Sequence, residues 1–365
     1  MKSIEDLATG GRLGPRAPLI RCVTAILSPS LLRTPDVKQP PFSLFRVLRE
    51  RSLPTCVTRC LNFVDDTAVD LTFLPRLDVH RRALRLQLCP KGVYKDFFLC
   101  ERSLLFVPEW FAPPQVWPQG LHQVGWPIEV NDTTEPMPED LARWLECTER
   151  KYGRTVVFTC GTGNPRHASD FFKASVSVVA RMNKSYRDKD LPSKFRVIVD
   201  EKIRTRAVFL TAHPEVLPEA VVEGVFHCAY ADFNALLPKC TAIIHGGGVG
   251  TVTAAVTHAT PQLIVPSAFD QFDNGRRVQL AGIGEVMPAK VRCKGSKRVV
   301  KKVREILWKL SDPWETNEYR KRYVRLKRTD DAERASKGLP LAVGHVLEMF
   351  DTMDPKPPAV LEFMS

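Results

Sequence analysis

Apolar and polar residues alternate in blocks along the second half of the chain. Short apolar runs typical of buried strands cover residues 154–159, 207–211, 224–230, 241–244 and 262–266. Longer segments with helical spacing of apolar residues cover 166–181, 249–258 and 274–281. Strands that alternate with helices of this length favour parallel βαβ units. We therefore predict a doubly wound α/β domain for this part of the chain.

The first half of the chain has a less regular pattern. It predicts strands within 18–27 and 103–107, helices between them, and a proline-rich aromatic loop at 108–120. The polar, acidic segment 127–140 is typical of a linker that runs into a helix. We therefore predict a partial amino-terminal domain over 1–126, a linker over 127–140, a ligand-binding domain over 141–312, and carboxyl-terminal helices over 313–365.

Composition narrows the class of protein. The chain has 365 residues, 44% of them hydrophobic and 26% charged, which indicates a soluble globular protein of two domains. Its 10 cysteines are irregularly spaced and include no C-x-x-C pair, so we predict reduced thiols and no metal site. No signal peptide or membrane-spanning run is visible. We expect a cytoplasmic protein, peripheral to a membrane at most.

The net charge of +12 is spread along the chain, with a basic segment at 290–309. A basic net charge is compatible with binding to nucleic acid, binding to an anionic membrane, or simply a solvated surface. We predict no nucleic-acid partner. Residues 296–310 form an amphipathic helix with Val299, Val303 and Leu310 on one face. We interpret it as a core-facing helix, the alternative being contact with a membrane that carries a lipid acceptor.

The strongest chemical signal is the sequence HGGGVGT, from His245 to Thr251, between a predicted strand and a predicted helix. Glycines allow a close approach of backbone and ligand, and a helix N-terminus presents free N–H groups to a diphosphate. His245 can donate a hydrogen bond to a phosphate oxygen, and Thr251 can add a hydroxyl. The alternative is a tight turn whose glycines serve packing alone.

Other phosphate-binding motifs fit this segment less well. It lacks the G-K-[ST] of a P-loop, and its glycine pattern differs from the G-x-G-x-x-G of dinucleotide-binding folds. Asp270 does lie at the distance where such folds place a ribose-binding acid. An NAD-type oxidoreductase is therefore kept as a weaker alternative.

Two further segments follow predicted strands of the same sheet. The sequence PSAFDQFDN, from Pro266 to Asn274, offers adjacent acid and amide groups that suit sugar hydroxyls, although Asp270 can instead cap a helix. The sequence TCGTGNP, from Thr159 to Pro165, is a second glycine turn in which Thr162 offers a hydroxyl. Together the three segments predict one site for a phosphorylated, sugar-bearing ligand.

These motifs carry a family resemblance. The stretch from Tyr230 to Gly284 resembles the donor-binding signature of the UDP-glycosyltransferase superfamily, in the branch with sterol and rhamnolipid-type enzymes. The order is a leucine-rich helix, an apolar strand, HGG-x-GT and then P-x-x-x-DQ-x-x-N. Segments 156–172 and 107–127 resemble other parts of the same branch, so the likeness runs from about Pro18 to Leu310.

The resemblance implies a GT-B fold of two Rossmann-like domains, here with the amino-terminal domain truncated and the carboxyl-terminal domain complete. It implies that a hexose moves from a UDP-sugar to a hydroxyl of a lipophilic acceptor such as a sterol or lipid, with inversion and without metal or cofactor. The implied diphosphate contacts are His245, Gly247 and Gly248, with Thr162 assisting, and Asp270 and Gln271 hold sugar hydroxyls. The donor-binding set is Thr162, His245, Gly247, Gly248, Thr251, Asp270, Gln271 and Asn274.

The chain departs from the family pattern in its first part. The family's catalytic histidine follows the first strand of the amino-terminal domain, and no matching segment precedes His80, which lies in a predicted helix. The catalytic residue is therefore unassigned. A catalytically incomplete nucleotide-sugar-binding protein, or a fragment of such an enzyme, is the main alternative.

Overall fold

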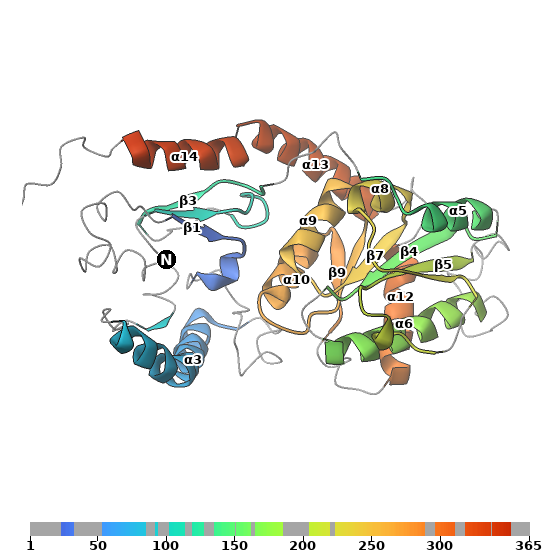
Figure 1. Ribbon diagram of the computed structural model, residues 1–365, viewed down its shortest axis with the longest axis horizontal. Coiled ribbons are helices and arrows are strands. Elements are labelled where there is room, and N and C mark those ends of the chain that lie inside the picture. The colour runs from blue at the N-terminus through green and yellow to red at the C-terminus, as the bar shows by residue number, and fades with distance from the viewer. Residues whose placement is uncertain are drawn as a thin grey trace, which may run out of the picture. The chain divides into compact units, whose positions relative to one another are not determined.

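The chain forms two units in a computed structural model (Figure 1). The first unit comprises Met1–Glu129 together with Asp330–Ser365, and the second comprises Val130–Thr329. The structure describes residues 23–32, 53–84, 92–93, 102–113, 119–127, 135–149, 151–161, 165–184, 204–219, 223–288, 296–310, 318–336 and 338–351. The two units are described separately below.

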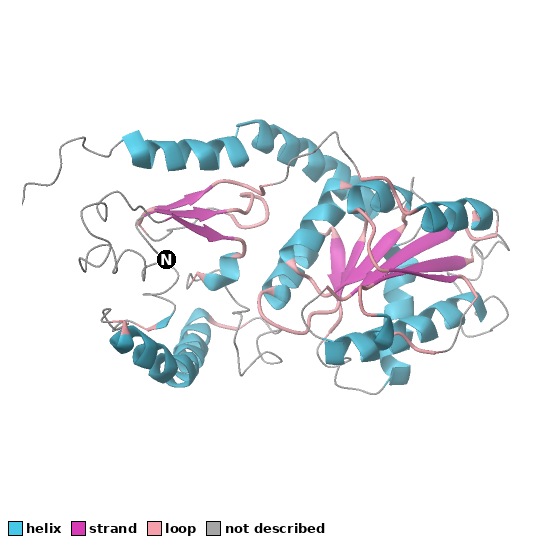
Figure 2. Ribbon diagram, in the orientation of Figure 1, coloured by secondary structure: helices cyan, strands magenta, loops and turns pink. Residues whose placement is uncertain are grey.

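The second unit is built on a six-stranded parallel sheet (Figure 2). The strands are β4 (Arg154–Thr159), β5 (Thr205–Leu210), β6 (Val225–Cys228), β7 (Ala242–His245), β8 (Gln262–Ile264) and β9 (Gly284–Val286). Their order is β6-β5-β4-β7-β8-β9. Every residue of β4, β5, β7 and β8 is buried, as in a sheet covered on both faces. The predicted doubly wound α/β arrangement is confirmed.

Helices cover both faces of this sheet. They are α5 (Glu139–Thr148), α6 (Pro165–Lys184), α8 (Phe233–Leu236), α9 (Val249–Thr257), α10 (Gln271–Leu280), α12 (Ser296–Leu310) and α13 (Glu318–Ser336), with one-turn helices η4 (Pro214–Val216) and η5 (Leu237–Lys239). Because side chains of a strand alternate between its faces, Phe158 packs in the core beneath α6 and α12, whereas Val157 packs beneath α5 and α8. The sheet is thus the middle of three layers.

The amphipathic segment 296–310 is the core-facing helix α12. Val303, Ile306, Leu307 and Leu310 are all buried in the same cluster as Phe172 of α6. This apolar face is therefore covered by the protein and is not the surface that the membrane alternative requires. In the part of the chain that the structure describes, no helix is long and apolar enough to cross a bilayer.

The first unit contains a three-stranded parallel sheet in the order β1-β2-β3. Its described elements are β1 (Val23–Ile26), η2 (Pro29–Leu31), α3 (Thr55–Ala83), β2 (Arg102–Leu105), β3 (Leu121–Gln123) and α14 (Leu339–Asp351). Ala342 of α14 packs against Leu104 and Val124 of the sheet region. The Arg102 guanidinium donates to Glu348 at 3.0 Å. The last described helix of the chain therefore belongs to the unit that contains its first strand.

Some elements differ from the sequence-based expectations. β3 and β9 were not expected, since LHQ and GEV are short and only partly apolar. They are strands because a neighbouring strand supplies the hydrogen bonds, as Gln262 of β8 does opposite Gly284. Helix α10 begins at Gln271, before the expected position 274. That shift moves Gln271 from a loop onto the first turn of a helix.

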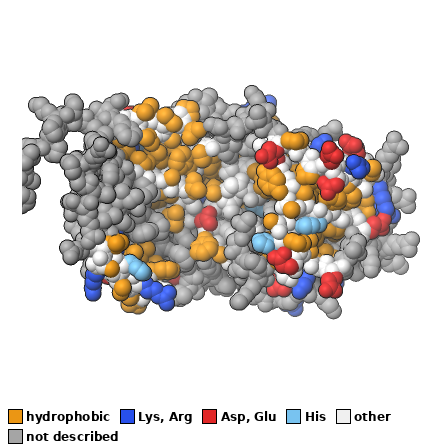
Figure 3. All heavy atoms as spheres, in the orientation of Figure 1, with side chains coloured by type: hydrophobic (Ala, Val, Ile, Leu, Met, Phe, Trp, Pro, Cys, Tyr) orange, Lys and Arg blue, Asp and Glu red, His pale blue; other side chains and the backbone are white. Residues whose placement is uncertain are grey.

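Helix α3 is a less buried element of the first unit. Its apolar residues Phe63, Leu71 and Val79 are 73%, 75% and 64% exposed, and orange side chains gather over this helix in Figure 3. His80 lies on the same helix and is also exposed. Its helical position was expected from the sequence, and nothing in its described surroundings marks it as a catalytic base.

Candidate functional site

The three sequence motifs meet at one edge of the second sheet. They follow β4, β7 and β8, which are neighbours, and Thr159, His245 and Ile264 stand side by side at the carboxyl ends of these strands. The chain leaves β4 toward β5 and β6 on one side and leaves β7 toward β8 and β9 on the other. Open α/β sheets bind ligands at such a switch point, beyond the carboxyl ends of the strands. The fold therefore places the motifs where a ligand is expected.

The glycine loop between β7 and α9 has no room for a side chain at Gly247. Gly247 has a φ of +94°, and a Cβ there would lie 2.6 Å from Cγ2 of Ile264. Gly246 lies between the other two loops, because a Cβ on it would be 3.5 Å from the Cys160 carbonyl and 3.5 Å from the Gln271 amide nitrogen. The three loops are therefore in contact around Gly246.

Gly248 is the N-cap of α9, and no side chain caps this helix end. The first helical hydrogen bond joins the Val252 N–H to the Gly248 carbonyl at 3.0 Å. The N–H groups of the preceding turn point out of the helix, where the positive end of its dipole also lies. A Cβ on Gly248 would meet nothing within 4 Å. The backbone here can accept an anion such as a diphosphate.

His245, at the end of β7, is only 1% exposed. Its Nε2 lies 3.0 Å from Oε1 of Gln262, and its Nδ1 accepts the Gly247 N–H at 3.1 Å. Burial lowers the pKa of His245 to about 4, so the ring is neutral at ordinary pH. Both ring nitrogens thus have protein partners. A hydrogen bond from this ring to a diphosphate stays a prediction, and it requires Nε2 to leave Gln262.

Asp270 stands at the start of α10, but its side chain makes no capping hydrogen bond. Its Oδ2 instead accepts the Asn274 amide at 2.9 Å. Burial raises the pKa of the Asp270 carboxyl, against a smaller opposing effect of that hydrogen bond. The capping alternative left open by the sequence therefore does not explain this residue. A half-buried carboxylate with one side-chain partner keeps oxygen lone pairs for a ligand.

Gln271 and Asn274 organise the loops around Asp270. Oε1 of Gln271 accepts hydrogen bonds from the backbone N–H groups of Ser267 and Ala268, at 2.8 and 3.1 Å. The Asn274 amide donates to the Gly247 carbonyl at 3.0 Å as well as to Asp270. Asn274 is completely buried, so in this structure it links two loops. Sugar contacts from either amide stay predictions.

Phe269 was not identified from the sequence. Its φ of +49° is rare for a residue with a bulky side chain, and 56% of it is exposed beside Asp270. Strained backbone of this kind tends to persist at ligand-binding loops. No local signal in PSAFDQFDN predicts this conformation, since the motif has no glycine or asparagine at that position.

The remaining expected residues are placed as follows. Thr251 lies on the first turn of α9 and is partly buried. Thr162 falls outside the described residues, so its role stays a prediction. The turn that precedes it is described as far as Gly161, which has a φ of +70°.

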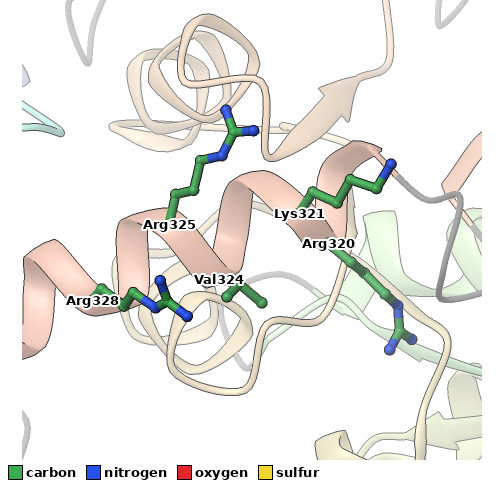
Figure 4. Close-up of a pocket in the computed structure, with 5 residues that line it drawn as sticks. All are labelled: Arg320, Lys321, Val324, Arg325 and Arg328. Atoms are coloured by element: carbon green, nitrogen blue, oxygen red, sulfur yellow. The ribbon is translucent and has the colours of Figure 1, made fainter.

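A basic pocket lies elsewhere, on α13 (Figure 4). Arg320, Lys321, Val324, Arg325 and Arg328 line its volume of about 310 Å³. Arg320 donates to the Cys240 and Thr241 carbonyls, at the opposite end of β7 from His245. This pocket is therefore separate from the three loops. Among the residues that the structure describes, no group of three or more histidines, cysteines or acids is arranged to hold a metal ion.

Comparison with known proteins gives a family-model match within the second unit. Residues 205–318 match the family model of the erythromycin biosynthesis protein CIII-like C-terminal domain. This range begins at β5 and contains both the glycine loop and the Asp270 loop. The segment of strongest resemblance in the sequence thus lies within a recognised carboxyl-terminal domain.

Individual relatives point the same way. The chain is 34% identical over 194 residues to 3-alpha-mycarosylerythronolide B desosaminyl transferase of Saccharopolyspora erythraea, covering 43% of this chain and 46% of that protein. It is 26% identical over 180 residues to sterol 3-beta-glucosyltransferase of Leptosphaeria maculans, covering 49% and 11% respectively. The chain spans less than half the length of these curated relatives.

A solved structure, that of the glycotransferase of kitacinnamycin, superposes with a TM-score of 0.53 at 16% identity. The match covers 76% of this chain and 61% of that one. At this identity the likeness concerns the fold, which is the α/β, GT-B class expected from the sequence.

Proposed function

We propose, on the premise that the chain belongs to the UDP-glycosyltransferase superfamily, that its second unit binds a nucleoside diphosphate-sugar for transfer to a small-molecule hydroxyl. The observation that carries the proposal is the meeting of the three loops at the switch point of the sheet, around an uncapped helix N-terminus. A free helix end with open space above Gly248 suits a diphosphate, and the acid beside it suits a sugar.

The donor-binding residues have separate roles in this proposal. The diphosphate lies on the glycine loop at Gly247 and Gly248, with His245 behind the loop. Hydroxyls of Thr162 and Thr251 assist. Asp270 and Gln271 hold the sugar, because carboxylate and amide groups can each pair with neighbouring hydroxyls. Asn274 supports both groups of contacts through its bonds to Gly247 and Asp270.

The reaction follows from these contacts. An acceptor hydroxyl displaces the nucleoside diphosphate in line, with inversion, and the helix end stabilises the leaving diphosphate without a cofactor. We propose a hexose from UDP as the sugar and a lipophilic molecule as the acceptor. The desosaminyl and sterol glucosyl relatives differ in both sugar and acceptor, so neither identity is transferred to this chain.

Calorimetry with UDP, UDP-glucose and NAD tests the donor site. We expect the nucleoside diphosphate ligands to bind and NAD to bind more weakly. Asp270→Ala should leave UDP affinity intact and reduce the preference for one UDP-sugar over another, because the partners of Asp270 are hydroxyls. Preferential binding of NAD would favour an oxidoreductase and overturn the proposal.

A second candidate function is donor binding without efficient transfer. It is favoured by the exposed position of His80 on α3, which is the first histidine of the chain and lies in no segment that matches the family's catalytic one. General-base assistance typically contributes about 10²–10⁴-fold in rate. Mass spectrometry of acceptor glycosylation decides between the two, comparing this chain with one extended by the upstream segment of a close relative. Equal, robust turnover by both would show that the base lies within the 365 residues.

A further inference from the structure

A chain of buried hydrogen bonds runs from α13 to the glycine loop. The Tyr323 hydroxyl accepts the Gln262 amide at 2.8 Å, Gln262 Oε1 lies 3.0 Å from His245 Nε2, and His245 Nδ1 accepts the Gly247 N–H at 3.1 Å. Tyr323 and Gln262 are 0% exposed and His245 is 1% exposed. Three almost completely buried polar side chains, joined by successive hydrogen bonds, therefore connect α13 to the glycine loop.

One backbone group determines which atom donates and which accepts in each hydrogen bond of this network. The Gly247 N–H can only donate, so His245 Nδ1 must carry a lone pair. A neutral ring then has its proton on Nε2, which donates to Gln262 Oε1. The Gln262 amide nitrogen consequently faces Tyr323, whose hydroxyl oxygen accepts. The arrangement is consistent only with a neutral His245 in the Nε2–H tautomer.

We propose that Gln262 and Tyr323 are positioning residues of the donor site. Gln262 accepts the Nε2 proton of His245 and keeps Nδ1 facing the Gly247 N–H, and Tyr323 holds the Gln262 amide, so that together they fix the shape of the glycine loop. The role of the loop as a diphosphate cradle rests on the function proposed above. In this role the ring acts on the ligand through the backbone of Gly247.

Packing alone does not account for these residue types. Burying polar side chains is unfavourable unless each has a partner, and apolar residues at such positions are often at least as stable. Gln262 and Tyr323 lie 61 positions apart, and their contact is maintained between a strand and a helix. A buried network whose members are satisfied fixes a unique local geometry. Here the end of that network is the left-handed residue Gly247.

The two roles for His245 predict opposite effects of releasing its ring. If Nε2 is needed to hold the loop, Gln262→Met leaves the proton unpaired and disorders Gly247. If Nε2 instead contacts the diphosphate directly, the same substitution frees the ring for the ligand. We expect Gln262→Met to weaken UDP binding roughly five- to tenfold, as for the loss of one or two buried hydrogen bonds, and Tyr323→Phe to weaken it less.

Thr241→Val is the matched control. Its hydroxyl donates to the Thr155 carbonyl at 2.8 Å, at the opposite end of β7 from His245. This variant also loses a hydrogen bond between strands, but we expect it to keep wild-type UDP affinity. UDP affinity unchanged or increased in Gln262→Met, or reduced equally in Thr241→Val, would overturn the positioning role.

Gln262→Glu adds a readout that a merely structural role would not produce. The carboxylate keeps the bond to Nε2 but favours a protonated ring, whose Nδ1–H then opposes the Gly247 N–H. In Gln262→Glu the pKa of His245 should be higher than in the wild type. We expect this variant to bind UDP almost as tightly as the wild type at high pH, and increasingly more weakly than the wild type as pH falls through that pKa. A ratio of affinities independent of pH would contradict the proposal.

The groups that could complicate this profile lie on the adjoining elements. They are Tyr323 on α13, Asp270 before α10 and Cys160 after β4, and the pKa of each is raised by burial. UDP itself also titrates. Wild type, measured at each pH, corrects for all of them, because they are common to both proteins.

Nitrogen NMR of histidine-labelled protein tests the network without any ligand. The His245 signal is identified by its loss in His245→Gln. We expect an unprotonated Nδ1 in the wild type and mixed tautomers in Gln262→Met. A wild-type ring protonated at Nδ1 would refute the network whether or not UDP binds. A correct tautomer in a protein that fails to bind UDP would instead refute the proposed function.

Discussion

Gly247 and Gly248 are adjacent glycines with different requirements. Gly247 needs its residue type for the fold, because a Cβ would collide with Ile264 in a left-handed backbone conformation. Gly248 has an ordinary φ of −62° and open space where a Cβ would lie. The space around position 248 therefore does not require glycine, and under the proposed function a ligand over the helix end is the reason for it.

Gly248→Ala separates these explanations. We expect the free energy of unfolding to change by less than about 1 kcal/mol, and UDP affinity to fall roughly tenfold, equivalent to about 1.4 kcal/mol. Gly344→Ala in α14 is the control, because its Cβ also meets nothing within 4 Å and it lies in the other unit. Thermal melting and calorimetry measure the two quantities. Unchanged UDP affinity in Gly248→Ala would place the diphosphate elsewhere.

Asp270 predicts a conflict between stability and ligand binding. Burial raises the pKa of its carboxyl, so the ionised form costs folding free energy as pH rises through that pKa. Asp270→Asn should match the wild type below the ordinary pKa of aspartate and become relatively more stable with rising pH. Urea denaturation across this range measures the difference. The same variant should bind UDP-glucose more weakly than wild type while binding UDP equally. A stability difference that does not change with pH would contradict this account.

At the scale of elements, α10 shows that two similar acids in one motif serve different purposes. Asp273 lies three residues after Asp270, but it is 0% exposed and accepts the Arg277 guanidinium at 2.6 Å on the same helix. Both partners are buried, so this carboxylate serves the helix itself and is not open to a ligand. The sequence pattern DQFDN does not distinguish these two carboxylates.

Asp273→Ala should destabilise the second unit by about 3–5 kcal/mol, because it leaves the buried Arg277 charge without this partner. Glu305→Ala, which breaks the exposed 3.5 Å pair with Lys302 in α12, should cost less than about 1 kcal/mol. Replacing Asp273 and Arg277 together with Leu and Met should recover most of the loss. Chemical denaturation compares the four proteins. If both single substitutions lowered the free energy of unfolding equally, the buried pair would contribute no more to stability than the exposed pair.

At the scale of the whole molecule, the chain returns to its first unit at the end. Ala342 of α14 is 3% exposed against Leu104 and Val124, whereas Leu347 on the same helix is 56% exposed. The first unit therefore depends on residues that lie more than two hundred positions from its strands. The three loops of the candidate site lie in the second unit.

Ala342→Asp should accordingly lower the melting temperature of the first unit and leave UDP affinity unchanged. A buried, unpaired carboxylate costs several kcal/mol, whereas Leu347→Asp is expected to have little effect. Differential scanning calorimetry with and without UDP measures both. A loss of UDP affinity in Ala342→Asp, absent from Leu347→Asp, would show that α14 supports the donor site.

The sequence by itself determined the class of the second unit and the positions of the three loops. Apolar runs such as 154–159 and the glycines after His245 are local signals, because strand burial and tight turns act within a few residues. Those signals were sufficient to predict the doubly wound sheet that the structure has, and the ligand site at the carboxyl ends of its strands stays a prediction. They also located the amphipathic helix that became α12.

Only the tertiary structure decided how those residues are used. It gave His245 partners on a strand and in the loop, turned Asn274 inward, and set Asp273 apart from Asp270. It also made strands of β3 and β9 and assigned α14 to the first unit. Each outcome depends on hydrogen bonds and burial between residues distant in sequence. A local pattern holds no record of which distant partner satisfies a buried polar group, so the fold alone specifies it.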